Sequence, residues 1–251
     1  MRRVLFFIFF IIFFSQIVNS AIVEVDIPKY LKGNISSFSY NYSLNILKFQ
    51  VEFYNTGSIA YKTRVRIDIL NYSQRVFTGW SEEKTLMPGD RKNFEVYWYT
   101  NSTGNFTASV RSYFANEIFE QKFNIEKSNS ILPEDIFEIK NFRTYDNFVI
   151  FDIKTIKDVK NVIVIPSNFP IGWVFEQKKI NSIDKNSKKI ITIRYYPTVR
   201  TRENLTLTIA SDEGKYYTEK SFELRKKTGI LWLVYYIIDN FKTNFNLMRF
   251  H

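Results

Sequence analysis

The chain carries few side chains of the types that perform chemistry. It has no cysteine, and its one histidine is the last residue, His251. Zinc centres and Ser–His or Cys–His couples need more than one such group, so neither is predicted. Three pairs of adjacent acids remain, each beside turn or linker residues: Glu82-Glu83, Glu134-Asp135 and Asp212-Glu213. Paired acids in loops are usually solvated, so we predict no catalytic residue, no metal site and no cofactor, and hence no enzyme.

Two tryptophans are candidates for stacking against a sugar ring. Trp80 and Trp173 follow glycines in segments that we expect to be loops, where an aromatic ring can face solvent. Trp98 falls on the inward side of an expected strand, which favours a place in the core. Tyr97 and Tyr99 flank it and would point outward, extending an exposed aromatic surface.

Six asparagines head N-x-Ser/Thr tripeptides, which are acceptors for glycans in exported proteins. Five fall in the first half of the chain, namely Asn34, Asn41, Asn71, Asn101 and Asn105. The sixth, Asn204, falls in the second half. Some tripeptides arise by chance in an Asn-rich chain. We expect at least one to be glycosylated in a host that has the machinery.

The last residues form a basic, aromatic-rich segment with helical spacing. Its apolar positions share one face at 100° per residue: Ile230, Leu233, Val234, Ile237, Ile238, Phe241, Phe245 and Met248. The continuous apolar stretch, residues 229–238, is too short to span a bilayer. The segment is typical of a helix that lies in the headgroup region. Docking on the second sandwich or on a partner protein fits the pattern equally well.

The first twenty residues have the layout of a secretory signal peptide. Arg2 and Arg3 precede an apolar run, residues 4–14, and small residues stand at positions 18–20. We expect cleavage before Ala21 and an extracytoplasmic location, secreted or at the cell surface. An uncleaved anchor is the alternative, and it leaves the bulk of the chain on the same side.

The segments that must position these residues alternate between apolar and polar side chains. Apolar residues recur at every second position in residues 49–53, 65–69 and 94–98, as in antiparallel strands covered on one side. Turn sequences at 55–57, 87–90 and 101–104 separate them. A second set, residues 148–224, follows a short linker at 128–133. Residues 148–153 are apolar on nearly both sides, which predicts a central strand.

The fold class predicted is therefore all-β, with two tandem antiparallel sandwiches. The expected divisions are a signal peptide at 1–20, sandwiches at 21–127 and 133–225, and a basic amphipathic tail at 226–251. The chain has 35 Lys and Arg against 25 Asp and Glu. Half of the excess that remains after signal removal lies in the tail, so both sandwiches are near neutral, and with the export signal this predicts no nucleic-acid partner.

Residues 51–58 (VEFYNTGS), 86–98 (LMPGDRKNFEVYW) and 104–117 (GNFTASVRSYFANE) resemble the CARDB-like and S-layer-like Ig modules of surface proteins. Residues 165–173 (IPSNFPIGW), 186–197 and 205–211 are similar to Ig-like modules found beside glycosidase domains. The resemblance implies Ig-like sandwiches that act as spacers, adhesins or binding modules, without catalytic residues.

The sequence thus predicts an exported, non-enzymatic structural or adhesion protein, held at the membrane surface by its tail and partnered by envelope proteins or glycans. Two alternatives stay open. One is a carbohydrate-binding accessory module that uses Trp80 and Trp173. The other is a subunit of a surface or secretion complex, docked through its C-terminal helix.

Overall fold

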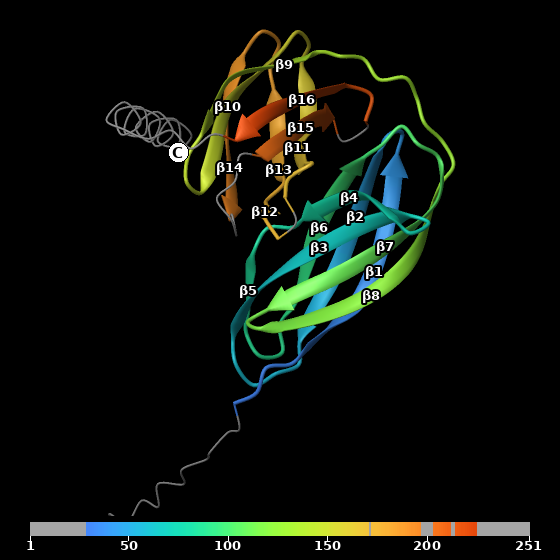
Figure 1. The fold of residues 1–251 in the computed structure, drawn as a ribbon, viewed down its shortest axis with the longest axis vertical. Coiled ribbons are helices and arrows are strands. Elements are labelled where there is room, and N and C mark those ends of the chain that lie inside the picture. The colour runs from blue at the N-terminus through green and yellow to red at the C-terminus, as the bar shows by residue number, and fades with distance from the viewer. Residues whose placement is uncertain (1–28, 171, 197–202, 212–213, 225–251) are drawn as a thin grey trace, which may run out of the picture.

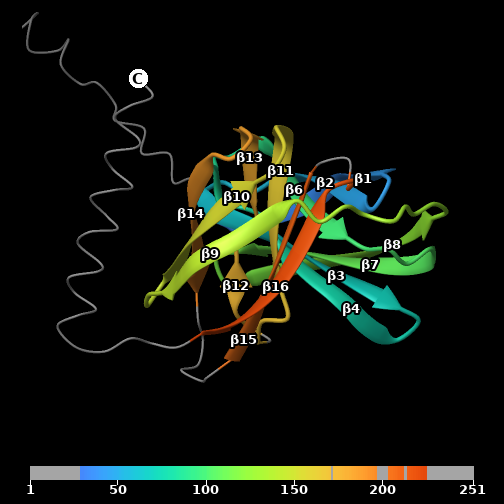
Figure 2. The same cartoon turned by 90° about the horizontal axis from the view of Figure 1, so that it is seen from above.

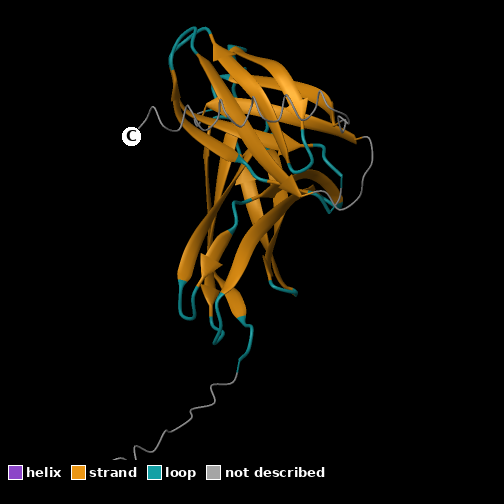
Figure 3. Cartoon of the chain, turned by 90° about the vertical axis from the view of Figure 1, so that its left-hand side faces the viewer, coloured by secondary structure: helices purple, strands orange, loops and turns teal. Residues whose placement is uncertain are grey.

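The computed structural model describes residues 29–170, 172–196, 203–211 and 214–224. Within these residues all helices are absent and the regular elements are strands (Figure 3), so the all-β prediction is confirmed. None of the described segments is a helix long and apolar enough to cross a bilayer. The predicted signal peptide, the tail and its eight apolar positions lie outside the described residues.

Eight strands form a first sandwich (Figure 1). They are β1 (Gly33–Ser43), β2 (Ile46–Asn55), β3 (Tyr61–Asn71), β4 (Gln74–Trp80), β5 (Lys84–Leu86), β6 (Arg91–Tyr99), β7 (Gly104–Phe114) and β8 (Glu117–Lys127). One sheet has the order β1-β2-β6, and the other has the order β4-β3-β7-β8 with β5 also pairing β3. All pairings are antiparallel, which is consistent with an Ig-like sandwich.

The alternation in the sequence sets which side chains face the space between these sheets. Phe49, Val51 and Phe53 of β2 are 0% exposed, as predicted from their spacing. The turn between β5 and β6 also follows its sequence. Gly89 has a positive φ of 80°, and the Asp90 carboxylate accepts a hydrogen bond from the Met87 amide at 3.0 Å. Glycine tolerates this conformation because it lacks a Cβ.

A second sandwich contains the other eight strands. They are β9 (Phe137–Thr144), β10 (Phe148–Thr155), β11 (Val159–Ser167), β12 (Val174–Phe175), β13 (Lys178–Ile183), β14 (Lys188–Tyr196), β15 (Glu203–Ser211) and β16 (Tyr217–Leu224). The sheet orders are β12-β14-β10-β9 and β13-β11-β15-β16. Strand β10 lies between two neighbours, as its two-sided apolar sequence predicts.

The same three phenylalanine positions recur in both sandwiches. In the first, Phe38 of β1 stacks on Phe123 of β8 at 4.0 Å between ring centroids, and it also stacks on Phe49 of β2. In the second, Phe142 of β9 stacks on Phe222 of β16 at 4.0 Å and on Phe151 of β10. Each set joins the first and last strands of its sandwich, which belong to opposite sheets.

The two sandwiches pack against each other (Figure 2), and the junction between them is buried and apolar. Val162 and Val164 of β11 belong to the core of the second sandwich. The alternate residues Ile163 and Ile165, with Ala210 of β15, join the core cluster of the first sandwich and are at most 1% exposed. Strand β11 is therefore covered on both faces, one by each core. The sequence predicts a linker at 128–133 between the sandwiches and does not predict this junction.

Candidate functional site: the junction between the sandwiches

A polar groove of about 260 Å³ lies where β5 and β6 of the first sandwich face β13 of the second. Its walls carry acidic, basic and amide side chains: Glu82, Lys84, Asn93, Glu95, Tyr97, Gln177, Lys178 and Lys179. Strand β6 is an edge strand of sheet β1-β2-β6 in the first sandwich, and β13 is an edge strand of sheet β13-β11-β15-β16 in the second. The two edge strands form the sides of the groove.

Gln177 connects the two strand edges across this groove. Its side-chain Oε1 accepts a hydrogen bond from the Tyr97 amide at 2.6 Å, and its Nε2 donates one to the Tyr97 carbonyl at 2.7 Å. The side-chain amide thus takes the place of a neighbouring strand for one residue of β6. Edge strands otherwise present unpaired backbone groups, which are costly when buried.

Two charged groups of the groove, Glu95 and Lys178, and the neighbouring Glu176 have shifted pKa values. Burial would raise the pKa of Glu95, but hydrogen bonds from Lys48 and Tyr97 outweigh it and the net shift is downward. Burial, with the nearby charges of Arg194 and Lys189, lowers the pKa of Lys178. Burial raises the pKa of Glu176 despite two nearby arginines. Glu95 forms an ion pair with Lys48, with 2.6 Å between Oε1 and Nζ.

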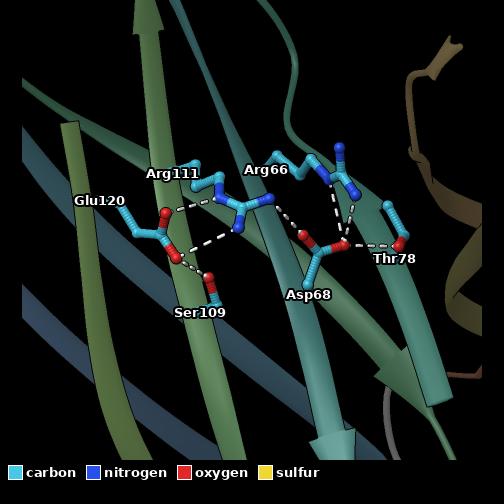
Figure 4. A network of polar contacts seen from close by, with 6 residues as sticks. All are labelled: Arg66, Asp68, Thr78, Ser109, Arg111 and Glu120. Atoms are coloured by element: carbon cyan, nitrogen blue, oxygen red, sulfur yellow. Dashed lines mark hydrogen bonds and ion pairs between the residues drawn. The ribbon is translucent and has the colours of Figure 1, made fainter. Parts of the chain in front are cut away.

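Beside the groove, a ladder of polar side chains crosses the outer face of sheet β4-β3-β7-β8 (Figure 4). Asp68, at its centre, is 3% exposed. One carboxylate oxygen of Asp68 accepts hydrogen bonds from Arg66 Nε at 3.0 Å, Arg66 Nη2 at 2.9 Å and Thr78 Oγ1 at 2.6 Å. The other accepts from Arg111 Nη1 at 3.3 Å. Arg111 then binds Glu120 of β8.

The Arg66 end of the ladder is buried because the second sandwich covers it. Arg66 lines a cavity of about 20 Å³ together with Phe169, Pro170 and Trp173, which precede β12. The Arg66 guanidinium also lies over the Trp80 ring, 5.7 Å from its centroid. Arg66 and Asp68, whose side chains are 9% and 5% exposed, thus compensate one another where little water reaches, which is the condition under which charges can remain buried. Arg111 and Glu120, at the other end of the ladder, are 32% and 37% exposed.

Two further contacts fix the opposite end of the junction. Asn45, 0% exposed, donates a hydrogen bond to the Ile131 carbonyl at 2.7 Å and accepts one from the Ile131 amide at 3.0 Å. Tyr99 of the first sandwich stacks on Tyr217 of the second, with 4.1 Å between ring centroids. The connection between the sandwiches is therefore pinned to the body of the molecule.

The structure corrects the expected positions of the aromatic candidates. Trp80 ends strand β4 and Trp173 precedes β12, and both are only 4% exposed. Trp80 packs against Tyr113, and Trp173 stacks on Tyr195, so neither ring offers a free face. Tyr97 is 6% exposed, because the second sandwich covers the outer face of β6. Trp98 is in the core as predicted.

The acidic pairs are placed in ionic contacts rather than together in a cavity. Glu83 forms ion pairs with Lys62 and Arg64. Burial alone would raise the pKa of Glu83, but the two cations together outweigh it, so the pKa is lowered. Glu134 binds Lys157. Asp212 and Glu213 lie outside the described residues. In the part of the chain that the structure describes, no three His, Cys, Asp or Glu side chains are grouped to hold a metal ion.

All six glycan-acceptor asparagines are exposed, namely Asn34, Asn41, Asn71, Asn101, Asn105 and Asn204. Asn101 is engaged by the Tyr99 hydroxyl, which donates a hydrogen bond to its side-chain oxygen at 2.9 Å. Exposure is compatible with modification, which stays a prediction.

No protein-family model matches the chain, and no curated protein matches it. Among solved structures, red sea bream transglutaminase is 9% identical, with a TM-score of 0.30 over 80% of this chain and 32% of that one. A Salmonella alpha-2-macroglobulin mutant is 10% identical, with a TM-score of 0.24 over 80% of this chain and 17% of that one. The chain thus spans a third or less of either protein.

A third similar structure is the CsuC–CsuE chaperone–tip adhesion subunit complex of Acinetobacter baumannii Csu pili. It is 11% identical, with a TM-score of 0.24 over 77% of this chain and 100% of that one. Scores this low carry no functional argument, so the function must be argued from the chain's own residues.

Proposed function

We propose that this chain is an exported, non-enzymatic structural or adhesive protein of the cell surface, built as a rigid pair of Ig-like sandwiches. The observation that carries the proposal is the junction. Apolar side chains of β11 join the core cluster of the first sandwich, and Gln177 and Asn45 add directional contacts around them. Interfaces that combine buried apolar area with satisfied polar groups hold a single geometry.

The remaining support comes from the sequence. The signal-like leader favours export, and the basic amphipathic tail favours a location at the membrane surface. The resemblance of residues 51–58, 86–98 and 104–117 to CARDB-like and S-layer-like modules favours a spacer or adhesive role. The alternative role in carbohydrate binding loses its motivating observation, because Trp80 and Trp173 are buried.

Location is tested by fractionating cells that express the full chain and sequencing the N-terminus of the product. We expect the product in the envelope fraction, beginning at Ala21 and sensitive to protease added to intact cells. Intact chain in the cytosol, with residues 1–20 retained, would refute export.

Rigidity is tested by spin labels, which the absence of native cysteine makes straightforward. Ser39→Cys on β1 and Lys185→Cys beyond β13 place one label at an exposed site on each sandwich. We expect a narrow distribution of label–label distances. A broad distribution would refute a rigid pair, and two labels within the first sandwich provide the matched control for label motion.

A further inference from the structure

The outer face of sheet β12-β14-β10-β9 collects basic side chains. The pairing register brings Glu138, Lys154 and Lys188 into one row, Lys140, Asp152 and Ile190 into the next, and Arg143, Ile150 and Thr192 into a third. Arg194 follows on β14, opposite Phe148. Five cationic side chains therefore share this face with two acidic ones. We call it the basic face.

Like charges lie directly opposite each other at one end of the basic face. Lys154 of β10 pairs with Lys188 of β14 in the register, an arrangement that is unfavourable in an isolated sheet. Asp152 offsets part of it: its carboxylate binds Lys188 Nζ at 2.8 Å and is nearly buried. Glu138 binds Lys140 at 2.8 Å. The ammonium of Lys154 has no comparable ion pair among the described residues, so the face retains an excess of positive charge.

These side chains border a shallow cavity of about 170 Å³, lined by Glu138, Lys140, Asn141, Asp152, Lys154 and Lys188. The three lysines are exposed, and their ammonium groups can reach outward while their stems cover the sheet.

The part of the basic face on β9 and β10, which carries Lys140 and Lys154, lies away from the apolar junction. That junction is made by the other sheet of the second sandwich, through Ile163 and Ile165 of β11 and Ala210 of β15. At its β12 edge the sheet of the basic face does contact the first sandwich, where Glu176 forms a β-bridge with Trp80 and Arg64 lies over the Tyr196 ring. Figure 2 shows β9 and β10 on the side away from β1 and β2. The face is thus open to a partner while the sandwiches stay packed together.

The chain also leaves the second sandwich beside this face. Strand β16 borders β9, with Lys220 Nζ donating to the Ile139 carbonyl at 3.3 Å and Phe222 stacked on Phe142. Directly after Leu224, where β16 ends, the sequence continues with Arg225-Lys226-Lys227 and then with the apolar stretch 229–238. In the sequence, further basic residues thus follow directly after the strand that borders β9.

We propose that the basic face binds an anionic lipid bilayer, so that the second sandwich lies on the membrane with the first projecting from it. This deepens the proposed function and depends on it for the location, at a membrane surface. A bilayer fits because clustered Lys and Arg are attracted to anionic headgroups, and because the adjoining chain supplies an apolar stretch that can enter the headgroup region.

The test uses co-sedimentation of the processed chain with vesicles of phosphatidylcholine alone or mixed with phosphatidylglycerol. The test variant is Lys140→Gln/Lys154→Gln/Lys188→Gln. The matched control, Lys62→Gln/Lys92→Gln/Lys122→Gln, removes the same charge from exposed positions on the first sandwich. A third variant, Arg225→Gln/Lys226→Gln/Lys227→Gln, reports the contribution of the tail. Circular dichroism shows whether each variant is folded.

We expect the wild-type chain to bind only the anionic vesicles, and more weakly as salt is raised. Each basic residue near an anionic surface contributes up to about a fivefold change in partition. Because Lys140 and Lys188 already have acidic partners, we expect the test variant to lose at least about tenfold in total. The control should bind like the wild type.

Equal losses in the test and control variants would overturn the proposal, since net charge alone would explain them. If the test variant binds as the wild type does and only the tail variant loses binding, the tail is the membrane-binding segment. This outcome would also overturn the proposal. If the wild-type chain binds heparin but not vesicles, and the triple-lysine variant loses heparin binding, the face binds an anionic polysaccharide and the bilayer proposal is overturned. Each of these outcomes can occur with or without export, so failure of the proposed function is seen separately by fractionation.

Discussion

Replacing Asp68 by asparagine should destabilise the protein strongly, although the change in shape is small. The substitution removes the negative charge that compensates Arg66, whose side chain is 9% exposed, and weakens the bonds from Thr78 and Arg111. Breaking one partner of a buried ion pair typically costs about 3–5 kcal/mol. Arg111 is 32% exposed and can rehydrate. We therefore expect a loss of about 3 kcal/mol in the free energy of unfolding.

The measurement is urea unfolding followed by far-ultraviolet circular dichroism, with tryptophan fluorescence as a second probe. For a chain of this size the expected loss corresponds to a fall in Tm of about 6–12 °C. The double variant Arg66→Met/Asp68→Leu should recover much of the loss, because no unpaired buried charge remains. Glu138→Gln breaks an ion pair at an exposed position and should leave the unfolding midpoint unchanged.

A loss below about 1 kcal/mol for Asp68→Asn would refute this reasoning, because it is the range of an exposed ion pair. The same conclusion would follow if the double variant were no more stable than the single one. Because the sandwiches share a core cluster, we also expect both probes to report one transition.

Three other predictions concern the junction, the pH dependence and the tryptophans. Gln177→Ala should cost about 1–3 kcal/mol, since the Tyr97 backbone loses both hydrogen bonds, and it should broaden the spin-label distances; an unchanged distribution would contradict this. Burial raises the pKa of Tyr195 to about 12, so the folded protein keeps a proton that the unfolded chain releases above pH 10, and stability should fall as pH rises from about 10 to about 12. Tyr195→Phe should make that fall shallower, and identical slopes in urea titrations would count against the assignment. Trp173→Ala should cost about 3–5 kcal/mol by leaving a cavity and should leave the glycan-array profile as it was; a selective loss of glycan signal in a folded variant would restore the stacking hypothesis.

Much of the strand pattern could be predicted because period-two alternation reflects the local geometry of a strand. The inward positions of Phe49, Val51 and Trp98 follow from it directly. The turn at 87–90 follows from Gly89, which occupies a conformation that other residues avoid. These features depend on a few neighbouring residues and need no knowledge of the rest of the chain.

The junction could not be predicted because alternation distinguishes the inward from the outward side chains of a strand but does not show whether another part of the chain buries the outward ones. Tyr97 and Asp68 are polar and outward in their strands, yet they are buried by a sandwich that comes later in the chain. One signal was available in the sequence. Residues 162–165 read Val-Ile-Val-Ile, and an uninterrupted apolar run predicts a strand covered on both faces. Trp80 and Trp173 were misplaced for the same reason.

The repeated phenylalanine stacks have a consequence for the order in which the chain can fold. In each half, the ring on the opening strand is covered only when the closing strand arrives, Phe123 over Phe38 and Phe222 over Phe142. During synthesis, which proceeds from the N-terminus, neither sandwich can therefore complete its core until its last strand has been made. Contacts between the ends of a segment form late because the intervening loop must first close. A chain truncated within β8 or β16 would leave apolar side chains of the opening strand exposed to solvent and would be prone to aggregate.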